Sequence, residues 1–447
     1  MSSERIKVKL GDIVDIFTGF PFKSAQYSEN PGDIKLIRGD NIAQGVLRWD
    51  GVKRWPVSGT EKLDSFWLKE NDVLLAMDRP WIPAGLKFAR VYLSDLPCLL
   101  VQRVACLRAK SGQDQNFIYS LLSTPAFSEY IQNVTTGTAV PHISVKQIKE
   151  FELEKLTLAD EREIGLIHGI IDSRIKLLRE TNATLEAIAQ ALFKSWFVDF
   201  DPVHANAGTQ APSLPAEIQA LFPSHLVETS QGLIPEGWMV GCIGDVVSVK
   251  GGYAFKSADF QDSGLPVIKI KNIVGDGTVD VSDVQKVSET IASKAQRFAL
   301  QSGDILMAMT GATIGKVGVF VSENEELAYL NQRVAKFENK SLDQKNTWLA
   351  FIAFSNAFMA EQIVNAASGS AQPNISAAGI ESTRLVVPSD KLVLSSFNDL
   401  VEPLFTGWIN NQKTIRTLAN LRDTLLPRLI SGQLRLPEAE AALVKVK

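Results

Sequence analysis

The segment TGTAVPHIS at residues 136–144 has a near copy in SGSAQPNIS at residues 368–376. Both read small–Gly–small–Ala–x–Pro–(His or Asn)–Ile–Ser, and the second lies 232 residues after the first. Four other pairs of segments match in the same order, with offsets of 230 to 233 residues: LGDIVDIFTGFPFKSA (10–25) with IGDVVSVKGGYAFKSA (243–258), IRGDNI (37–42) with IKIKNI (268–273), DVLLAM (72–77) with DILMAM (304–309), and QRVA (102–105) with QRVA (332–335). Five collinear matches indicate that the chain contains two copies of one unit.

Each copy begins with a globule of about 150 residues. Short apolar runs such as IKLIRGDNI, DVLLAM and LLVQRVACL alternate with Gly and Asp turns and predict strands. Longer apolar stretches at 116–134 and 346–367 predict helices. Because regular βαβ alternation is missing, we predict two mixed α/β (α+β) globules with mostly antiparallel or mixed sheets.

The second part of each copy has the four–three spacing of a coiled-coil seam. The seam positions of the first copy are Ile164, His168, Ile171, Ile175, Leu178, Asn182, Leu185, Ala189, Leu192 and Trp196. Those of the second copy are Phe397, Val401, Leu404, Trp408, Asn411, Ile415, Leu418, Arg422, Leu425 and Leu429. We expect two helices of about 50 Å each that pair antiparallel, which gives the chain an approximate internal two-fold.

Two details of these helices carry further expectations. The seam residues Asn182 and Asn411 are expected to set the register of the pair, the alternative being polar residues tolerated at a surface edge. Pro427 is expected to kink or end the second helix.

These patterns divide the chain into six segments. They are a first globule (1–155), a helix (156–200), a linker (201–235), a second globule (236–388), a second helix (389–432) and a tail (433–447). The stretch 201–238 holds five of the 19 prolines and has little periodicity. It is therefore expected to be a tether with one short helix near residues 215–221.

The duplicated phrase lies where each globule ends. Its glycine is expected to permit an unusual backbone angle, its proline to stiffen the next turn and its serine to cap a short helix. These residues are Gly137, Pro141 and Ser144 in the first copy and Gly369, Pro373 and Ser376 in the second. An architectural role is favoured, with contact to a ligand as the alternative.

The composition indicates a globular protein with real cores, since 45% of the 447 residues are hydrophobic and 21% are charged. Three cysteines without disulfide or metal spacing, and no signal-peptide pattern or membrane-length apolar run, favour a cytoplasmic protein without a membrane partner. The net charge is −4, with +3 on residues 1–150 and −3 on residues 236–388. If DNA is bound, another subunit is expected to share the contacts to phosphate.

No catalytic motif stands out. TGATIGKVG (310–318) resembles a phosphate-binding loop, but only three residues separate Gly311 from Gly315, and Val317 follows Lys316 where Ser or Thr is required. The four histidines have no metal-ligand spacing, so no metal site is predicted. The chain is expected to bind and organise instead of catalysing, although a nucleotide hydrolase built on residues 310–318 stays open as an alternative.

Three further segments carry a resemblance to a known family. LEAIAQALFKSWFVDFDPV (185–203) and LANLRDTLLPRLISGQL (418–434) are similar to the two spacer regions of the specificity subunit of type I restriction-modification systems. IPEGWMVGCIGDV (234–246) resembles the start of one of its target-recognition domains. The resemblance covers essentially the whole chain.

The resemblance implies a non-catalytic DNA-recognition subunit. Each globule would be a target-recognition domain that reads one half of a bipartite, asymmetric site in double-stranded DNA. The helices would fix the gap between the halves and dock two methyltransferase subunits, which methylate adenine N6 with S-adenosylmethionine. Two restriction subunits that use ATP and Mg can join, so this chain itself would hold no cofactor. The alternative is a coiled-coil scaffold with globules that bind protein or glycan.

We predict that DNA is contacted by loop residues, mainly ones whose side chains suit base edges, such as Arg and Lys for guanine and Asn for adenine. In the first copy they are Lys23, Arg38, Asn41, Arg79, Trp81 and Lys87. In the second copy they are Lys256, Lys269, Lys271, Asn272, Thr310, Thr313 and Lys316. The loops 78–87 and 310–316 are favoured because they occupy the same place in both copies and differ in sequence. The identical Gln-Arg pairs at 102–103 and 332–333 favour a shared structural or backbone role.

Overall fold

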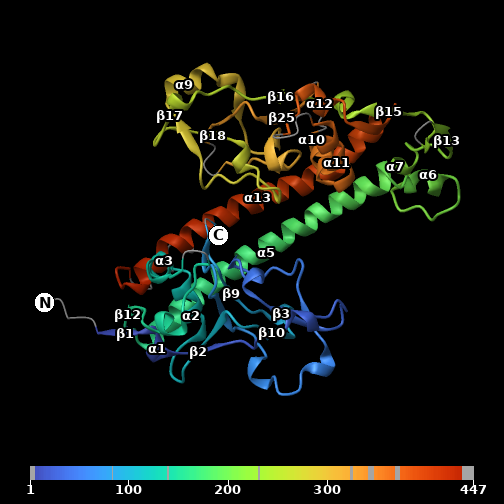
Figure 1. Ribbon diagram of the computed structural model, residues 1–447. Coiled ribbons are helices and arrows are strands. Elements are labelled where there is room, and N and C mark those ends of the chain that lie inside the picture. Colours follow the sequence, from blue (N-terminus) through green and yellow to red (C-terminus); the bar gives the residue numbers. More distant parts are fainter. Residues whose placement is uncertain are drawn as a thin grey trace. The chain divides into compact units, whose positions relative to one another are not determined.

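A computed structural model provides the structure of the chain (Figure 1). It describes residues 6–82, 84–137, 140–229, 232–322, 326–340, 347–367 and 373–434. Contacts between residues divide the chain into two compact units: unit 1 consists of residues 1–175 and 417–447, and unit 2 of residues 176–416. Two helices of 40 residues, α5 (Leu158–Phe197) and α13 (Lys391–Ile430), each contribute residues to both units.

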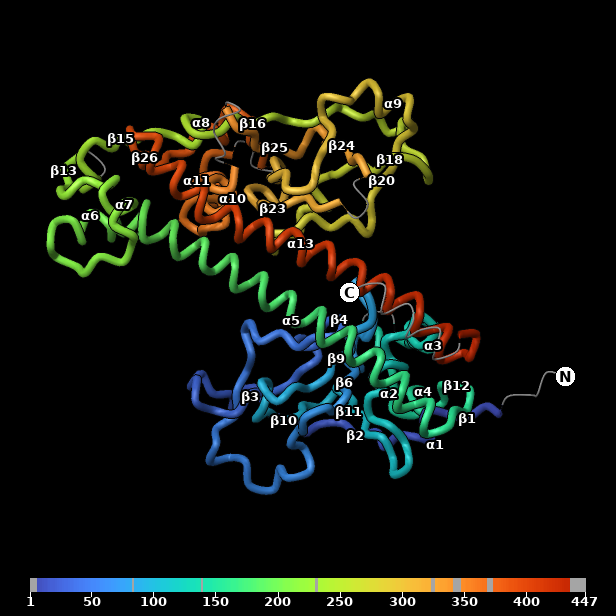
Figure 2. Tube along the Cα trace, turned by 180° about the vertical axis from the view of Figure 1, so that it is seen from behind, coloured from blue at the N-terminus to red at the C-terminus, as the bar shows by residue number. Residues whose placement is uncertain are grey.

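Unit 1 contains two small mixed sheets (Figure 2). The five-stranded sheet has the order β2-β11-β6-β9-β4, with strands Val14–Thr18, Val104–Ala109, Val73–Ala76, Phe88–Arg90 and Gln44–Gly45. The three-stranded sheet has the order β10-β3-β5, with strands Cys98–Leu100, Ile34–Ile37 and Arg54–Trp55. Two antiparallel pairs complete the strands: β1 (Lys7–Lys9) with β12 (Glu152–Glu154), and β7 (Trp81–Ile82) with β8 (Gly85–Leu86). The short helices are α1 (Leu10–Ile13), α2 (Gln115–Leu122), α3 (Pro125–Val134) and α4 (Val145–Lys149).

Unit 2 repeats this plan. One five-stranded sheet has the order β16-β25-β22-β23-β19, with strands Val247–Gly251, Val334–Asn339, Ile305–Ala308, Val317–Val319 and Gly277–Thr278. The other has the order β17-β20-β18-β24-β21, with strands Phe260–Gln261, Gln285–Val287, Leu265–Ile268, Ala328–Leu330 and Ala299–Leu300. The pair β15 (Trp238–Cys242) with β26 (Arg384–Pro388) corresponds to β1 with β12. The helices of the globule are α8 (Ile243–Val246), α9 (Glu289–Lys294), α10 (Thr347–Ser355), α11 (Ala357–Ala366) and α12 (Ala377–Glu381).

The five-stranded sheet of unit 1 therefore has the strand order of β16-β25-β22-β23-β19, and its three-stranded sheet corresponds to β24-β18-β20, with β17 and β21 additional in unit 2. The parallel pair β10 with β3 in unit 1 corresponds to β24 with β18 in unit 2, and β4 with β9 corresponds to β19 with β23. The predicted duplication and the predicted mixed α/β class are both confirmed.

Within unit 2, α5 and α13 pair antiparallel. The Nδ2 of Asn411 donates to Oδ1 of Asn182 at 2.8 Å, and the Nδ2 of Asn182 donates to the carbonyl of Trp408 at 3.2 Å. Further along, the rings of Trp196 and Phe397 are 5.7 Å apart. Asn182 is only 4% exposed, so the surface-edge alternative is wrong for it. Its hydrogen bonds to α13 fit the predicted role in the register, which stays a prediction.

The second helix does not end at Pro427, because α13 continues to Ile430. A proline removes one backbone hydrogen bond from a helix. Here the last two turns still bury Leu425, Leu426 and Leu429, each less than 7% exposed. This apolar burial explains why the helix continues through the proline.

The segment predicted to be a tether is folded. It forms α6 (Asp201–Asn206), α7 (Ala216–Gln219) and the hairpin of β13 (Leu226–Thr229) with β14 (Gly232–Pro235). Val203 and Phe222 are 1% and 5% exposed and belong to the main core of unit 2. The ring of Phe222 lies 5.0 Å from that of Trp196, so aromatic packing fixes a segment whose sequence lacks periodicity.

The helix caps predicted from the duplicated phrase are confirmed. The hydroxyl of Ser144 accepts a hydrogen bond from the amide of Gln147 at 3.2 Å, and that of Ser376 accepts one from Gly379 at 3.0 Å. Gly137 has a φ of +96°, a backbone angle that glycine adopts readily. Gly369 lies outside the described residues.

Among the described helices, none alone has the length and apolar character to cross a lipid bilayer. Only α10 and α11 taken together have them, and a bend of 88° separates these two helices.

Candidate nucleic-acid interface

In unit 1 the duplicated phrase holds the candidate recognition loop that follows β6. The amide of Arg79 donates to the carbonyl of Pro141 at 2.6 Å, and the amide of Ile143 donates to the carbonyl of Met77 at 2.9 Å. The proline of the phrase thus accepts a bond from the loop itself. The phrase is architectural, as favoured, and what it builds is the base of this loop.

Unit 2 has the same pair of hydrogen bonds after β22. The amide of Gly311 donates to Pro373 at 3.0 Å, and the amide of Ile375 donates to Met309 at 3.0 Å. The backbone that supports the two candidate loops is therefore alike, whereas their side chains differ.

The loop of unit 1 brings three of the predicted residues together. Arg79 is exposed and has a φ of +47°, and Trp81 is 39% exposed on the β7–β8 hairpin. Lys87 is half-buried, and its pKa is lowered mainly by burial and further by the nearby Arg79 charge. A phosphate close to Lys87 would favour the charged form of this lysine and so oppose the effect of burial.

The loop of unit 2 is smaller and less charged. Thr310 is buried, Thr313 is half-buried and Lys316 is exposed, with its Nζ 3.5 Å from the carbonyl of Val274. A short 3₁₀ turn, η9 (Gly311–Thr313), leads directly into strand β23. A phosphate-binding loop needs a helix N-terminus at that point, so the structure gives no support to a nucleotide hydrolase here.

Two predicted base readers have structural roles instead. The Oδ1 of Asn41 accepts from the amide of Arg38 at 3.0 Å, and its Nδ2 donates to the carbonyl of Arg48 at 3.1 Å. The Oδ1 of Asn272 likewise accepts from the amide of Lys269 at 2.9 Å. Asn41 and Asn272 are 5% and 2% exposed, so neither side chain is available to a base and the prediction is wrong for both. Asn side chains commonly close turns in this way.

The other predicted cations lie on the surface of their globules. Lys23 and Lys256 are exposed at matching positions, each just before a 3₁₀ turn, η1 (Ser24–Gln26) and η6 (Ser257–Asp259). The guanidinium of Arg38 pairs with Asp40 at 3.1 Å. Such exposed positions permit contact with DNA phosphate.

Two lysines of unit 2 already have partners. The Nζ of Lys269 donates to Oε1 of Gln285 at 2.6 Å, and burial, followed by the neighbouring Lys271 charge, lowers its pKa. Lys271 pairs with Asp283 at 2.7 Å. Binding of DNA by these two lysines would require exchange of these partners.

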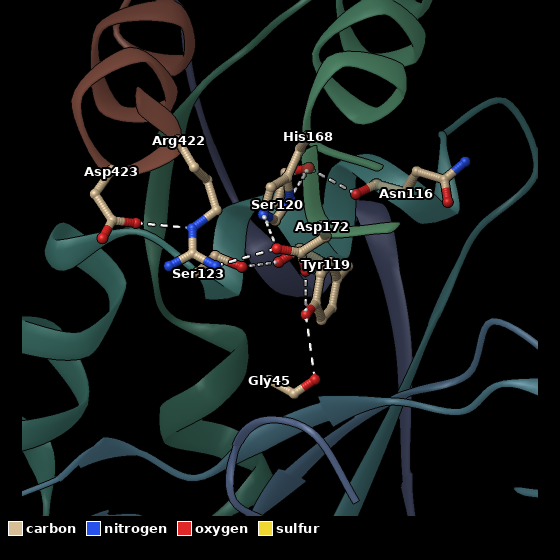
Figure 3. A network of polar contacts seen from close by, with 9 residues as sticks. All are labelled: Gly45, Asn116, Tyr119, Ser120, Ser123, His168, Asp172, Arg422 and Asp423. Carbon is tan, nitrogen blue, oxygen red and sulfur yellow. Dashed lines mark hydrogen bonds and ion pairs between the residues drawn. The ribbon is translucent and has the colours of Figure 1, made fainter. Parts of the chain in front are cut away.

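A buried polar network in unit 1 is a second place where titratable groups meet (Figure 3). The hydroxyl of Tyr119 donates to Oδ2 of Asp172 at 2.7 Å, and Nη1 of Arg422 donates to Oδ1 of the same carboxylate at 3.1 Å. The Nδ1 of His168 lies 2.9 Å from Oγ of Ser120. The network joins the first globule to α5 and α13. Because Tyr119 and His168 are 2% and 0% exposed, it is closed to a substrate.

Unit 2 has an apolar version of the same junction. The positions that correspond to Tyr119, His168 and Asp172, by offsets of 232 and 233 residues, are Phe351, Val401 and Phe405. All three are buried, and the ring of Phe405 stacks on that of Trp348 at 4.2 Å. The polar network was not predicted, since its one sequence signal was a histidine at a seam position.

The stability of unit 1 is expected to depend on pH through His168. Burial lowers the pKa of its imidazole to about 4, against about 6.5 in an unfolded chain, so unfolding takes up a proton between these pH values. Stability should fall by about 2 kcal/mol between pH 7 and pH 5 and level off below pH about 4. Urea unfolding at several pH values measures this, and a His168→Val chain should lose most of the dependence. An unchanged dependence in that variant would contradict the assignment.

In the described residues, no group of three or more His, Cys, Asp or Glu side chains is arranged to hold a metal ion.

Comparison with known proteins identifies the family. The family model described as "Type I restriction modification DNA specificity domain" matches residues 3–187 and 235–392, one stretch in each copy. The chain belongs to this family. Type I specificity proteins recognise DNA and are not catalytic, so the scaffold and hydrolase alternatives are not favoured.

The relatives agree with this assignment. The chain is 27% identical over 331 residues to the MjaIX type I restriction enzyme specificity subunit of Methanocaldococcus jannaschii, over 74% of this chain and 71% of the relative. It is 36% identical over 184 residues to the EcoAI specificity subunit of Escherichia coli, over 41% of this chain and 30% of the relative. The crystal structure of a type I specificity subunit from M. genitalium has the same fold, with a TM-score of 0.56, 16% identity and 96% of each chain covered.

Proposed function

We propose that each globule of this specificity subunit reads one half of a bipartite, asymmetric DNA site. The observation that carries the proposal is the pair of loops at 78–87 and 310–316. One loop follows β6 and the other follows β22. Equivalent backbone hydrogen bonds hold both loops, yet their side chains differ. A common backbone with different side chains suits two readers of two different sequences.

The two long helices are proposed to set the gap between the half-sites. Helices of 40 residues are about 60 Å long, and half-sites read from one side of a duplex lie about 34–36 Å apart. The buried seam and the Asn182–Asn411 hydrogen bond support a fixed register within unit 2. A fixed register would make the gap a constant of the protein.

We further propose that two methyltransferase subunits dock on the helices. Apolar side chains on α5 are open to solvent: Leu166 and Ile170 in unit 1, at 61% and 55%, and Leu177 and Ile188 in unit 2, at 52% and 44%. Such side chains suit contact with another protein. The methyltransferases would bind S-adenosylmethionine, and two restriction subunits with ATP and Mg would join in the cytoplasm.

The modest charge of the globules fits such an assembly. Affinity for DNA depends mainly on phosphate contacts, and the second globule has a net charge of −3. The methyltransferase subunits would supply part of the positive charge around the duplex.

Mapping of methylated adenine tests the proposal. The chain is expressed with the methyltransferase encoded beside it in a host without other adenine methylation, and the genome is sequenced with a method that detects N6-methyladenine. The expected result is one motif with two defined halves and a constant gap. Methylation at scattered or contiguous sites, or none with a folded complex, would contradict it.

A change in one loop is expected to affect one half-site. Arg79→Ala should weaken binding of the methyltransferase complex to its own site about tenfold and relax the half-motif read by unit 1, because a bidentate arginine contact to guanine contributes about 1–3 kcal/mol. Lys316→Ala provides the matched change in unit 2 and should leave the half-motif read by unit 1 intact. Loss of specificity in both halves from either variant would contradict separate readers.

A further inference from the structure

The Gln-Arg pairs at 102–103 and 332–333 are identical in the two copies and exposed in both. They lie in the turns that join β10 to β11 and β24 to β25. The side chain of Arg103 is 60% exposed. Exposed turns diverge readily after a duplication, so two identical charged side chains need an explanation.

The main chain of these turns forms equivalent hydrogen bonds in both units. In unit 1 the amide of Gln102 donates to Phe20 at 3.0 Å, and the carbonyl of Arg103 accepts from Met77 at 2.9 Å. In unit 2 the equivalent bonds join Gln332 to Tyr253 at 2.9 Å and Met309 to Arg333 at 3.1 Å. Almost any residue supplies these groups. The shared backbone role predicted from the sequence is therefore present, but it does not account for the side chains.

Backbone conformation does not account for them either. Arg103 has a left-handed φ of +68°, whereas Arg333 does not have a positive φ. One residue type thus occupies two different conformations. Nearby positions that form the same backbone hydrogen bonds have also changed between the copies: Arg79 in unit 1 corresponds to Gly311 in unit 2. A partner outside the fold, met by both copies, explains the identity best.

Both arginines lie beside the candidate recognition loops. Nη1 of Arg103 is 3.8 Å from Oδ1 of Asp78, the residue before Arg79. Nη1 of Arg333 is 3.4 Å from Oδ1 of Asn374, which pairs in a β-bridge with Thr310. Through these contacts each guanidinium points toward its loop. Because both distances are long, the contacts do not use all the hydrogen-bond donors of the guanidinium.

We propose that Arg103 and Arg333 each bind a backbone phosphate of duplex DNA next to the half-site that their unit reads. The proposal rests on the proposed function. A guanidinium offers several donors in a plane that matches phosphate oxygens, and phosphate carries no base identity. Identical arginines beside different loops then supply the sequence-independent part of binding, while the loops supply the specificity.

The test uses the complete methyltransferase complex and measures DNA affinity against salt. Arg103→Ala and Arg333→Ala are each expected to weaken binding about five- to tenfold at about 0.1 M salt, equally on the recognised site and on unrelated duplex. Each should lower the slope of log affinity against log salt by about one, and the methylated motif should stay unchanged. Arg103→Gln and Arg333→Gln, which keep a long polar side chain, should behave like the alanine variants.

Controls separate this role from a general loss of charge. Lys7→Ala and Lys294→Ala each remove one exposed positive charge outside the candidate loops and the Gln-Arg turns. Both variants should keep the DNA affinity and the salt slope of the wild type. Wild-type affinity and slope in the arginine variants, or a changed motif, would overturn the inference. Absence of DNA binding by the wild-type complex would instead overturn the proposed function.

Discussion

Replacing Asp172 with alanine is expected to destabilise unit 1 by about 3–5 kcal/mol, because breaking a buried ion pair leaves an uncompensated charge. The carboxylate of Asp172 is 14% exposed and accepts from both Tyr119 and Arg422. Burial alone would raise its pKa, but the charges of His168 and Arg422 and these two hydrogen bonds outweigh it and hold the pKa below the usual value. Its loss would leave Arg422 inside unit 1 without this partner.

Denaturant unfolding of the full chain measures the loss, and hydrogen exchange in α2 localises it to unit 1. The matched control copies the residues of unit 2 into unit 1. It combines Tyr119→Phe, His168→Val, Asp172→Phe and Arg422→Ala, after Phe351, Val401, Phe405 and Ala189. Apolar packing often replaces a buried ion pair at little cost, so this chain should recover most of the stability. An Asp172→Ala chain with the denaturation midpoint of the wild type would show that the network contributes little.

The features predicted well from the sequence are those that leave a periodic or repeated pattern. The duplication required only aligned segments, and both long helices followed from the four–three spacing of apolar residues. Ser144 and Ser376 were identified as caps because serine before a short helical pattern has one main use. Each of these signals is local or internal to the chain.

The features that were missed depend on tertiary packing. Asn41 and Asn272 have the side chain of an adenine reader, but their burial is decided by the turns they close. The segment 201–235 has no periodicity, yet Phe222 anchors it on Trp196. The Tyr119–Asp172–Arg422 network joins residues from three separate parts of the chain, which no window of sequence brings together.

The two junctions show how far the copies have diverged without a change of fold. Polar side chains occupy the junction in unit 1, and stacked aromatic rings occupy it in unit 2. The hydrogen bonds that support the loops have stayed alike. The same backbone hydrogen bonds are therefore present in both units, although the side chains around them differ.

Four residues added to each long helix are expected to lengthen the gap in the DNA motif and to leave both halves unchanged. The insertions follow Ala183 in α5 and Asn410 in α13, the residues next in sequence to the hydrogen-bonded Asn182 and Asn411. A coiled coil absorbs four residues by local unwinding, and each helix grows by about 6 Å. At about 3.4 Å per base pair, the gap should increase by one or two base pairs.

A four-residue insertion after Gly208, in the loop between α6 and α7, is the control and should leave the gap as it is. It adds the same length of chain outside the paired helices. An insertion in α5 alone should abolish methylation, because it shifts one half of the seam against the other.

The most direct test is the methyladenine motif of the wild type beside that of the double-insertion variant, both purified as complexes with the methyltransferase. The account predicts the same two half-motifs in both, with a longer gap in the variant. An unchanged gap, or an altered half-motif with the gap preserved, would contradict the claim that paired helices space two separate readers along DNA.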